Sequence, residues 1–293
     1  MSVGPEIEAS ANPGALAPVR LDRLAAGVVD AVFAAGDAIM EVYGRADHGV
    51  VHKADASPLT AADQAAQRIL AAALAELAPD IPMLSEEGEH ADGAERQRWS
   101  ACWIVDPLDG TKEFVARNDE FTVNVALVVG SRPVLGVVGV PARSEAFLGV
   151  VPVGRAERIT AAGRAGTPIR TRACPEAPVI LASRSHRSAA LEQLLDALRA
   201  RFPGAREQAA GSALKLVELA CGRCDGYPRL GPCAEWDIAA GEAVLLAAGG
   251  ALSRYDGTPL RYNKPDSLLN PDFFAVGDPD SALARWLLAW GEG

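Results

Sequence analysis

The segment that most constrains the fold covers residues 103–114, with the sequence Trp-Ile-Val-Asp-Pro-Leu-Asp-Gly-Thr-Lys-Glu-Phe. Its first three residues are apolar and predict the end of a buried strand, after which the polarity changes abruptly. Asp106 and Asp109 follow across a turn, where both carboxylates and the Leu108 carbonyl can converge on one point. Oxygen ligands of this kind are those that a hard cation such as Mg²⁺ prefers.

Gly110 and Thr111 stand directly after the second carboxylate, at the expected start of a helix. Free backbone N–H groups and the helix dipole favour an anion at such a position. A turn alone would explain Asp, Pro and Gly. It would not explain a second Asp placed to share a cation with the first, nor a Thr at the helix entrance. A cation site beside an anion site indicates phosphoryl chemistry.

The composition describes an ordinary globular protein. The 293 residues are enough for one large domain or two packed domains, and 49% of them are hydrophobic and 23% charged. The formal net charge of −10 argues against a general nucleic-acid-binding surface, which needs a basic face. This charge fits a protein that gathers carboxylates around cations, although solubility alone would also explain it.

The cysteines predict reduced thiols in a cytoplasmic protein. Their number is odd and no secretory signal precedes them, which disfavours a disulfide framework. Cys221 and Cys224 form a single CxxC pair with no second pair at zinc spacing, so buried or incidental thiols are favoured over a zinc or redox site. The apolar runs are too short for a membrane span.

The N-terminal half is predicted to begin with a disordered leader over residues 1–20, which are rich in Ala, Pro, Gly and Ser. Two amphipathic helices follow at residues 21–43 and 61–77, because their apolar residues recur at helical steps. A short strand is expected at residues 81–84. Three strand-like segments with short polar links then predict an antiparallel meander; they cover residues 121–129, 134–140 and 145–151.

The C-terminal half alternates between strands and helices, which indicates an α/β layer structure. Strands are expected at residues 179–182, 205–208, 225–230, 251–255 and 273–276, and helices at residues 189–201, 213–221, 236–248 and 281–290. Residues 154–172 are expected to form a connector or one further hairpin. We place the domain boundary near residue 174, which gives an N-terminal α+β domain over 21–174 and a C-terminal α/β domain over 175–293.

Three further acidic positions each allow a structural explanation. Thr60 and Asp63 match a capping box at a helix start. Glu86 could belong to a solvated acidic loop, and Asp237 could be the N-cap of a helix. Each of these signals is weak when it is taken alone.

Four motifs together resemble the inositol monophosphatase superfamily. The sequence Asp-Pro-Leu-Asp-Gly-Thr-Lys-Glu-Phe at 106–114 resembles its first signature, and Trp-Asp-Ile-Ala-Ala-Gly at 236–241 resembles its second. Ser-Glu-Glu at 85–87 and Ser-Pro-Leu-Thr-Ala-Ala-Asp at 57–63 match in order and approximate spacing. The Lys-Glu-Phe ending and the form of the 57–63 segment are more similar to the bacterial 3′(2′),5′-bisphosphate nucleotidase branch than to true inositol monophosphatases.

The resemblance implies a layered α/β/α/β/α sandwich, in which two helices cover an N-terminal antiparallel sheet, a C-terminal α/β domain follows, and two or three Mg²⁺ ions lie between. The implied metal ligands, of which Asp106 would bridge two ions, are Glu86, Asp106, the Leu108 carbonyl, Asp109 and Asp237. Asp63 and Thr111 would position and activate a water. The backbone amides of Gly110 and Thr111 would hold the scissile phosphate, so that the substrate is surrounded by these groups and the metal ligands.

Substrate recognition is expected to involve a second group of residues, through a second phosphate and the nucleoside. The candidates are His186 after a strand, Ser212 and Lys215 at a helix start, and Arg229 at a strand end. A strand-end His, a Ser N-cap and a solvated Lys would explain the same residues without any ligand.

The activity that the resemblance implies is Mg²⁺-dependent, Li⁺-sensitive removal of the 3′-phosphate from adenosine 3′,5′-bisphosphate, a reaction of sulfur metabolism. The alternatives are an inositol monophosphatase, a broad sugar-phosphate phosphatase, or a metal- or nucleotide-binding protein without catalysis. The resemblance also allows a homodimer and peripheral association with the inner membrane, although no basic amphipathic segment marks an anchor.

Overall fold

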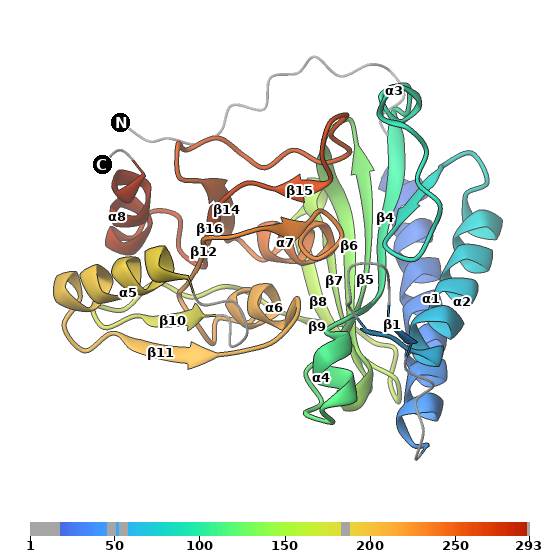
Figure 1. The fold of residues 1–293 in the computed structure, drawn as a ribbon, viewed down its shortest axis with the longest axis horizontal. Coiled ribbons are helices and arrows are strands. Elements are labelled where there is room, and N and C mark those ends of the chain that lie inside the picture. The colour runs from blue at the N-terminus through green and yellow to red at the C-terminus, as the bar shows by residue number, and fades with distance from the viewer. Residues whose placement is uncertain (1–17, 46–50, 53–57, 183–187, 292–293) are drawn as a thin grey trace.

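The computed structural model describes residues 18–45, 51–52, 58–182 and 188–291. Figure 1 shows five layers, in which two helical layers cover the outer faces of two sheets and a third lies between the sheets. Helices α1 and α2 pack on one face of the seven-stranded sheet. Helices α6 and α7 fill the space between the sheets, and α5 and α8 cover the five-stranded sheet. The predicted α/β/α/β/α sandwich is confirmed.

The helices have the bounds α1 Pro18–Tyr43, α2 Ala61–Leu77, α3 Gly93–Arg96, α4 Thr111–Val115, α5 Ala189–Arg201, α6 Leu214–Ala220, α7 Ala239–Ala247 and α8 Ala282–Trp290. The seven-stranded sheet has the order β3 (Met83–Ser85), β4 (Ala101–Asp109), β5 (Thr122–Val129), β6 (Arg132–Val140), β7 (Glu145–Val150), β8 (Arg155–Thr160) and β9 (Thr167–Pro168). The five-stranded sheet has the order β11 (Arg206–Ala209), β10 (Val179–Ala182), β12 (Gly226–Arg229), β16 (Phe273–Val276) and β14 (Ala251–Arg254). Two small strand pairs join β1 (Val51–His52) to β2 (Pro58–Leu59) and β13 (Cys233–Ala234) to β15 (Leu269–Asn270).

The two N-terminal helices form where the apolar periodicity places them, except that α1 begins at Pro18, inside the segment predicted to be a disordered leader. Val28 and Ile39 of α1 are fully buried against the sheet. Helix α2 begins with the predicted capping box: the Thr60 backbone N–H and hydroxyl donate to Asp63 Oδ2 at 2.7 and 2.6 Å, and the Thr60 hydroxyl accepts from Ala62 N at 3.1 Å. Two of the N–H groups that lack a partner inside the helix are therefore satisfied.

The first sheet differs from the prediction in two places. Strand β3 pairs with β4 in parallel, because residues 86–100 cross back before β4 begins, so the sheet is not entirely antiparallel. Residues 154–172 contain the antiparallel strands β8 and β9, as the hairpin alternative predicted. Strand β4 does not end after Val105 but continues through Asp109, because a bulge absorbs the turn.

Helix α7 lies directly on the first sheet and brings the segment before it close to β4. Two glycines of the sheet permit this approach. A Cβ atom at Gly136 would lie 2.3 Å from the Ala240 carbonyl oxygen, and one at Gly149 would lie 2.5 Å from that of Ala243. Any larger residue at these positions would push the helix away from the sheet.

All five cysteines are free, as predicted, and Cys102, Cys224 and Cys233 are buried. Burial raises the pKa of both Cys221 and Cys224 to about 11, so both remain protonated thiols at neutral pH. Within the described ranges, no helix is long and apolar enough to cross a membrane. The division into two domains near residue 174 stays a prediction.

Glu242 of α7 is a buried acid between the two sheets. Its side chain is fully buried, one carboxylate oxygen accepts from the Tyr262 hydroxyl, and the nearest Arg132 nitrogen lies 3.7 Å from the other oxygen. Burial raises the pKa of Glu242 from 4.5 to about 7, and the Arg132 charge opposes this rise only in part.

Replacing Glu242 by Gln is expected to change the free energy of unfolding more favourably at pH 8 than at pH 5. Because the folded-state pKa is raised, the native protein holds a proton that the unfolded chain has released, and stability falls as pH rises through about 7. A pKa difference of this size corresponds to about 3 kcal/mol in the free energy of unfolding once the pH is above both pKa values. Denaturant unfolding at both pH values, without divalent cations, measures the difference. An equal effect of the substitution at pH 5 and pH 8 would contradict this account.

Candidate active site

Three aspartates converge between the two sheets. Asp106 and Asp109 come from β4 and Asp237 from the turn before α7, and one carboxylate oxygen of each lies within 4.8 Å of the others. Residues three apart in a regular strand point to opposite faces. Asp106 lies opposite Asn124 and Asp109 opposite Thr122, so β4 carries one extra residue between them, and this bulge returns both carboxylates to one face.

The carboxylates of this cluster are costly to ionise together in the absence of a cation. Asp106 is buried; its Oδ1 accepts from Leu108 N at 3.0 Å, whereas its buried Oδ2 has no hydrogen-bond partner in the described residues. Burial, together with the charges of Glu86 and Asp109, holds the pKa of Asp106 well above its usual range. Burial also raises the pKa of Asp237 to about 8. A bound cation would remove this penalty.

Asp109 and Glu86 complete the acidic group. Asp109 Oδ2 accepts from Ala213 N at 2.7 Å. Burial raises the pKa of Asp109 to about 6, against the opposing charge of Lys215. Glu86 follows β3, where its backbone N–H donates to the Val105 carbonyl at 3.1 Å, and its charge acts on Asp106. The structure thus brings three of the four predicted carboxylate ligands into one cluster, and the charge of the fourth, Glu86, acts on all three.

The affinity for Mg²⁺ is expected to rise between pH 6 and pH 8. Protons compete with the cation for the carboxylates, and the folded-state pKa values of Asp109 and Asp237, about 6 and about 8, place both titrations in this range. Isothermal titration calorimetry in two buffers of different ionisation enthalpy should record proton release on binding. An affinity that does not change with pH would contradict the assignment.

Asp63 and Thr111 meet at the edge of this group. The Thr111 hydroxyl lies 3.3 Å from Asp63 Oδ1 and 3.3 Å from the Leu108 carbonyl oxygen, and it can donate to either. The Thr60 contacts hold the other oxygen of Asp63, whose side chain is buried. The two residues that were predicted to act as a pair are therefore in contact; their catalytic role stays a prediction.

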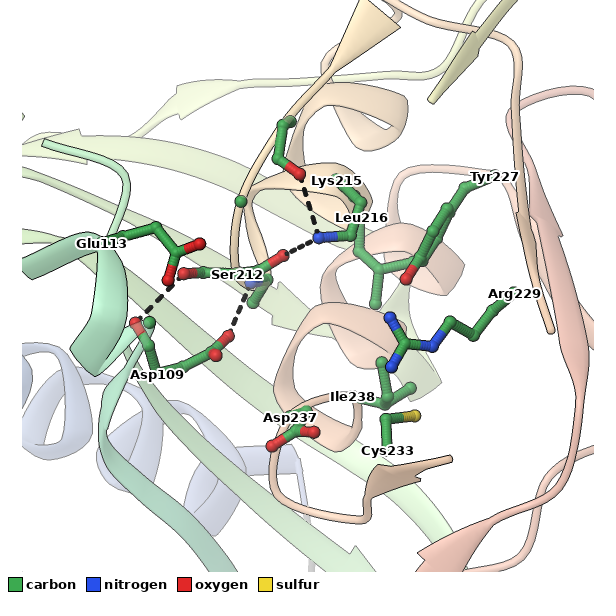
Figure 2. A pocket seen from close by; sticks show the side chains of 14 residues that line it. Asp109, Glu113, Ser212, Lys215, Leu216, Tyr227, Arg229, Cys233, Asp237 and Ile238 are labelled. Atoms are coloured by element: carbon green, nitrogen blue, oxygen red, sulfur yellow. Dashed lines mark hydrogen bonds between the residues drawn. The ribbon is translucent and has the colours of Figure 1, made fainter. Parts of the chain in front are cut away.

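Gly110 and Ser212 join β4 to the second half of the chain. Gly110 has a φ of 89° at the start of α4, a conformation that favours glycine. A Cβ atom there would lie 2.3 Å from the Ser212 hydroxyl oxygen. That hydroxyl is 3.1 Å from the Asp109 carbonyl oxygen (Figure 2). It is 2.7 Å from the carbonyl oxygen of Glu120.

A pocket opens beside the aspartates (Figure 2). Lys215 and Arg229 give it a basic side. The Lys215 ammonium donates to the carbonyl oxygens of Ala210 and Ser212 at 3.2 and 2.8 Å, and burial lowers the pKa of Lys215 to about 8. Arg229 is 9% exposed and donates to the Pro232 carbonyl at 2.7 Å. The lining residues are Asp109, Gly110, Glu113, Ala210, Gly211, Ser212, Ala213, Lys215, Leu216, Tyr227, Arg229, Cys233, Asp237 and Ile238.

Three residues do not have the purely structural roles that the sequence also allowed, and those alternatives are wrong. Ser212 has a φ of 46° and is not the N-cap of α6, which is Ala213. Lys215 is buried rather than solvated, because its ammonium reaches back to the preceding turn. Asp237 is not the N-cap of α7, which is Ile238; it accepts instead from Ala234 N at 2.9 Å.

The start of α6 differs from the expected phosphate site. Two amides of this turn already face carboxylates: Gly211 N donates to Glu120 Oε2 at 3.0 Å, and Ala213 N donates to Asp109. A second phosphate would therefore meet the side chains of Lys215 and Arg229 rather than these amides. His186 lies outside the described residues.

Some pocket residues had no assigned role in the sequence. Glu113 belongs to the recognised motif at 106–114, so its position could have been anticipated. Tyr227 lies within β12 and Cys233 begins β13, and no local signal marks either as a pocket residue. The contact between Ala213 and Asp109 joins residues 104 positions apart, a distance at which no local pattern operates.

Comparison with known proteins defines the class. The model of the inositol monophosphatase family matches residues 20–285, and the chain belongs to this family. The 3′(2′),5′-bisphosphate nucleotidase CysQ of Shigella flexneri is 44% identical over 240 residues, which cover 82% of this chain and 94% of that protein. CysQ of Escherichia coli K12 is 43% identical over the same shares of both chains.

Solved structures give the same result. CysQ from Bacteroides thetaiotaomicron is 37% identical, with a TM-score of 0.76 over 87% of this chain and 97% of that chain. An inositol monophosphatase from Zymomonas mobilis is 26% identical, with a TM-score of 0.72 over 93% of this chain and 98% of that one. The predicted family, and the resemblance to its bisphosphate nucleotidase branch, are confirmed.

Proposed function

We propose that this protein is a Mg²⁺-dependent 3′(2′),5′-bisphosphate nucleotidase that converts adenosine 3′,5′-bisphosphate into AMP and inorganic phosphate. One observation carries the proposal: a cluster of carboxylates, one of which is buried with an unsatisfied oxygen, stands beside a pocket with a basic side. The first feature fits divalent cations and the second fits an additional phosphate. The similarity to CysQ proteins supports the nucleotide as substrate.

The residues present fit divalent cations. All are oxygen donors, and the orphaned Oδ2 of Asp106 lies among them. The metal would be held by Glu86, Asp106, the Leu108 carbonyl, Asp109 and Asp237. When bound, two or three Mg²⁺ ions would supply Lewis-acid polarisation of the phosphoryl oxygens and lower the pKa of an attacking water.

Thr111 and Asp63 would remove a proton from that water. The Thr111 hydroxyl can donate to Asp63, which leaves its oxygen lone pairs directed away from the carboxylate and able to accept from the water. As the water oxygen bonds to phosphorus, the bond between phosphorus and the ribose 3′ oxygen would break. The water proton would pass to the Thr111 oxygen while the Thr111 proton passes to Asp63, and the 3′ oxygen would take a proton from solvent and leave as the hydroxyl of AMP. The Gly110 and Thr111 amides at the start of α4 would hold the phosphoryl oxygens.

Lys215 and Arg229 would favour a substrate with two phosphates. Both side chains donate to backbone carbonyls, which fixes their position but leaves their charge uncompensated by those contacts. A 5′-phosphate beside them would gain charge-assisted hydrogen bonds that a monophosphate lacks. Glu113 lines the same pocket, and its charge acts on Lys215.

The test measures phosphate release from adenosine 3′,5′-bisphosphate, inositol 1-phosphate and fructose 1,6-bisphosphate at matched Mg²⁺, with and without Li⁺. We expect kcat/KM for the nucleotide to exceed that for inositol 1-phosphate by ~10-fold or more, because Lys215 and Arg229 stay unpaired with a monophosphate. Fructose 1,6-bisphosphate also carries two phosphates, so it tests whether the nucleoside itself is required. Comparable turnover of all three would contradict nucleotide specificity and favour a broad phosphatase. No turnover of any would favour a binding protein. The cytoplasmic location, membrane association and homodimer stay predictions.

A further inference from the structure

Glu86 and Asp237 approach the proposed metal site from different halves of the chain, and a set of buried contacts outside the site joins their segments. We infer that Arg96, Asn263, Lys264 and Glu235 form a relay that fixes the position of Asp237 relative to Glu86 and thereby sets the affinity for the divalent cation. This inference rests on the proposed metal site. None of the four residues belongs to the acidic group, so we assign them a positioning role.

Glu235 anchors the turn that carries Asp237. Its side chain is fully buried, and its carboxylate accepts from the backbone N–H groups of Asn263 and Lys264 at 2.5 and 3.2 Å. The Lys264 ammonium pairs with the same carboxylate. The Glu235 carbonyl accepts from Ala239 N at 3.0 Å, which closes the turn around Asp237. Both ends of this residue are therefore held.

Arg96 connects the same loop to the other half. It ends α3, the helix that follows the Glu86 segment, and only 5% of it is exposed. Arg96 Nη2 donates to the Lys264 carbonyl at 2.7 Å, and Nε donates to Asn263 Oδ1 at 3.2 Å. The Asn263 amide returns a bond to the Arg96 carbonyl at 2.9 Å. Loop residues 263–264 are thus held by α3 on one side and by Glu235 on the other.

A second contact crosses between the same two segments. His90 Nε2 lies 2.7 Å from the carbonyl oxygen of Ser85, the residue before Glu86. The His90 ring centre lies 5.4 Å from that of Trp236, the residue before Asp237. The segments of Glu86 and Asp237 are therefore linked in two ways: directly through this ring contact and indirectly through the relay.

A network of this kind is expected to affect the orientation of the metal ligands more than the free energy of unfolding. A buried ion pair contributes little net stability by itself, but a fully satisfied buried polar network restricts the chain to one arrangement. Partners that orient metal ligands without touching the metal typically affect metal affinity by ~10- to 100-fold when they are removed. The relay has the connections that such a role requires.

Two variants interrupt the relay at different points. Asn263→Gly removes the amide that Arg96 binds but keeps the backbone, because Asn263 has a φ of 55°, which glycine adopts readily. Glu235→Gln keeps the shape but replaces one acceptor oxygen with a donor that faces either a backbone N–H or the Lys264 ammonium. Arg98→Ala, at an exposed position two residues after Arg96, serves as the matched control. Asp237→Asn tests the proposed metal site itself.

The readout is the Kd for Mg²⁺ from calorimetry, beside kcat at saturating Mg²⁺ and a thermal unfolding curve for each variant. We expect Asn263→Gly and Glu235→Gln to weaken Mg²⁺ binding by ~10-fold or more while kcat at saturation stays near wild type, and Arg98→Ala to bind normally. If Glu235→Gln does not fold, Asn263→Gly decides the question. Folded relay variants with wild-type Kd values would overturn the relay. Wild-type binding by Asp237→Asn would instead overturn the proposed metal site.

Discussion

Replacing Asp106 by Asn is expected to lower Mg²⁺-dependent phosphate release by at least ~10²-fold, because several kcal/mol of charge stabilisation depends on the cations that this carboxylate would hold. Asp106 is buried among Glu86, Asp109 and Asp237, and its Oδ2 has no protein hydrogen-bond partner among the described residues. An amide of the same shape keeps the packing and removes the charge. Steady-state kinetics over a Mg²⁺ titration measure the loss.

The same substitution should stabilise the metal-free protein. Because the folded-state pKa of Asp106 is raised, the wild type loses stability as pH rises above the ordinary aspartate range, and the Asn variant lacks this loss. In a chelator at pH 8 the variant should therefore unfold at a higher temperature than the wild type. Saturating Mg²⁺ should reverse this order, because the cation stabilises only the form that binds it.

The control is Asp196→Asn, which removes an exposed carboxylate on α5. It should change neither activity nor the response of the unfolding temperature to Mg²⁺. The account of Asp106 would be wrong if Asp106→Asn kept near wild-type activity, or if the variant and the wild type gained equal stability from Mg²⁺.

Replacing Thr111 by Val is expected to lower kcat by ~10²- to 10⁴-fold, the range in which a positioned proton-transfer group contributes to catalysis. Valine keeps the β-branched shape at the start of α4 but cannot accept a proton from water or donate to Asp63. Mg²⁺ affinity should stay near wild type, because the carboxylates of the acidic group are untouched. Rapid-quench measurement of a single turnover isolates this step.

Thr111→Ser supplies the matched control, because it keeps the hydroxyl and removes only a methyl group. Serine should retain most of the activity, and Asp63→Asn should show the same loss as Thr111→Val. A serine variant as impaired as the valine variant would show that the methyl group matters rather than the hydroxyl. Retained activity of Thr111→Val would assign the proton transfer to another group.

The elements that follow from local sequence were predicted with their bounds. Helix α2 begins at Ala61 because the Thr60 capping box marks it, and α5 begins at Ala189 because Ser188 accepts from Leu191 N at 3.1 Å. Helix α7 was predicted to begin at residue 236 but begins at Ala239. Strand β13 pairs with β15, which lies far along the chain, and this pairing holds residues 235–238, between β13 and α7, in a turn.

In the site, too, the features that depend on neighbouring residues were predicted, and those that depend on residues far along the chain were not. Asp106, Asp109 and Thr111 stand within one motif, so their shared location could be read from spacing. The bulge that turns both carboxylates to one face depends on pairing with β5 and was not predicted. The burial of Lys215 depends on the fold of the preceding turn and on Tyr227, whose ring centre lies 5.4 Å from the ammonium. Such contacts cannot be predicted from the periodicity of the sequence.

The most direct test of the central claim is a crystal soaked with Mn²⁺, which replaces Mg²⁺ at oxygen sites and gives an anomalous signal. We expect anomalous difference peaks between Asp106, Asp109 and Asp237, with Asp106 bound to more than one ion, and no such peaks in crystals of Asp106→Asn. An active enzyme whose crystals show Mn²⁺ only elsewhere, or wild-type peaks in the Asp106→Asn variant, would contradict the claim that these carboxylates hold the catalytic metal.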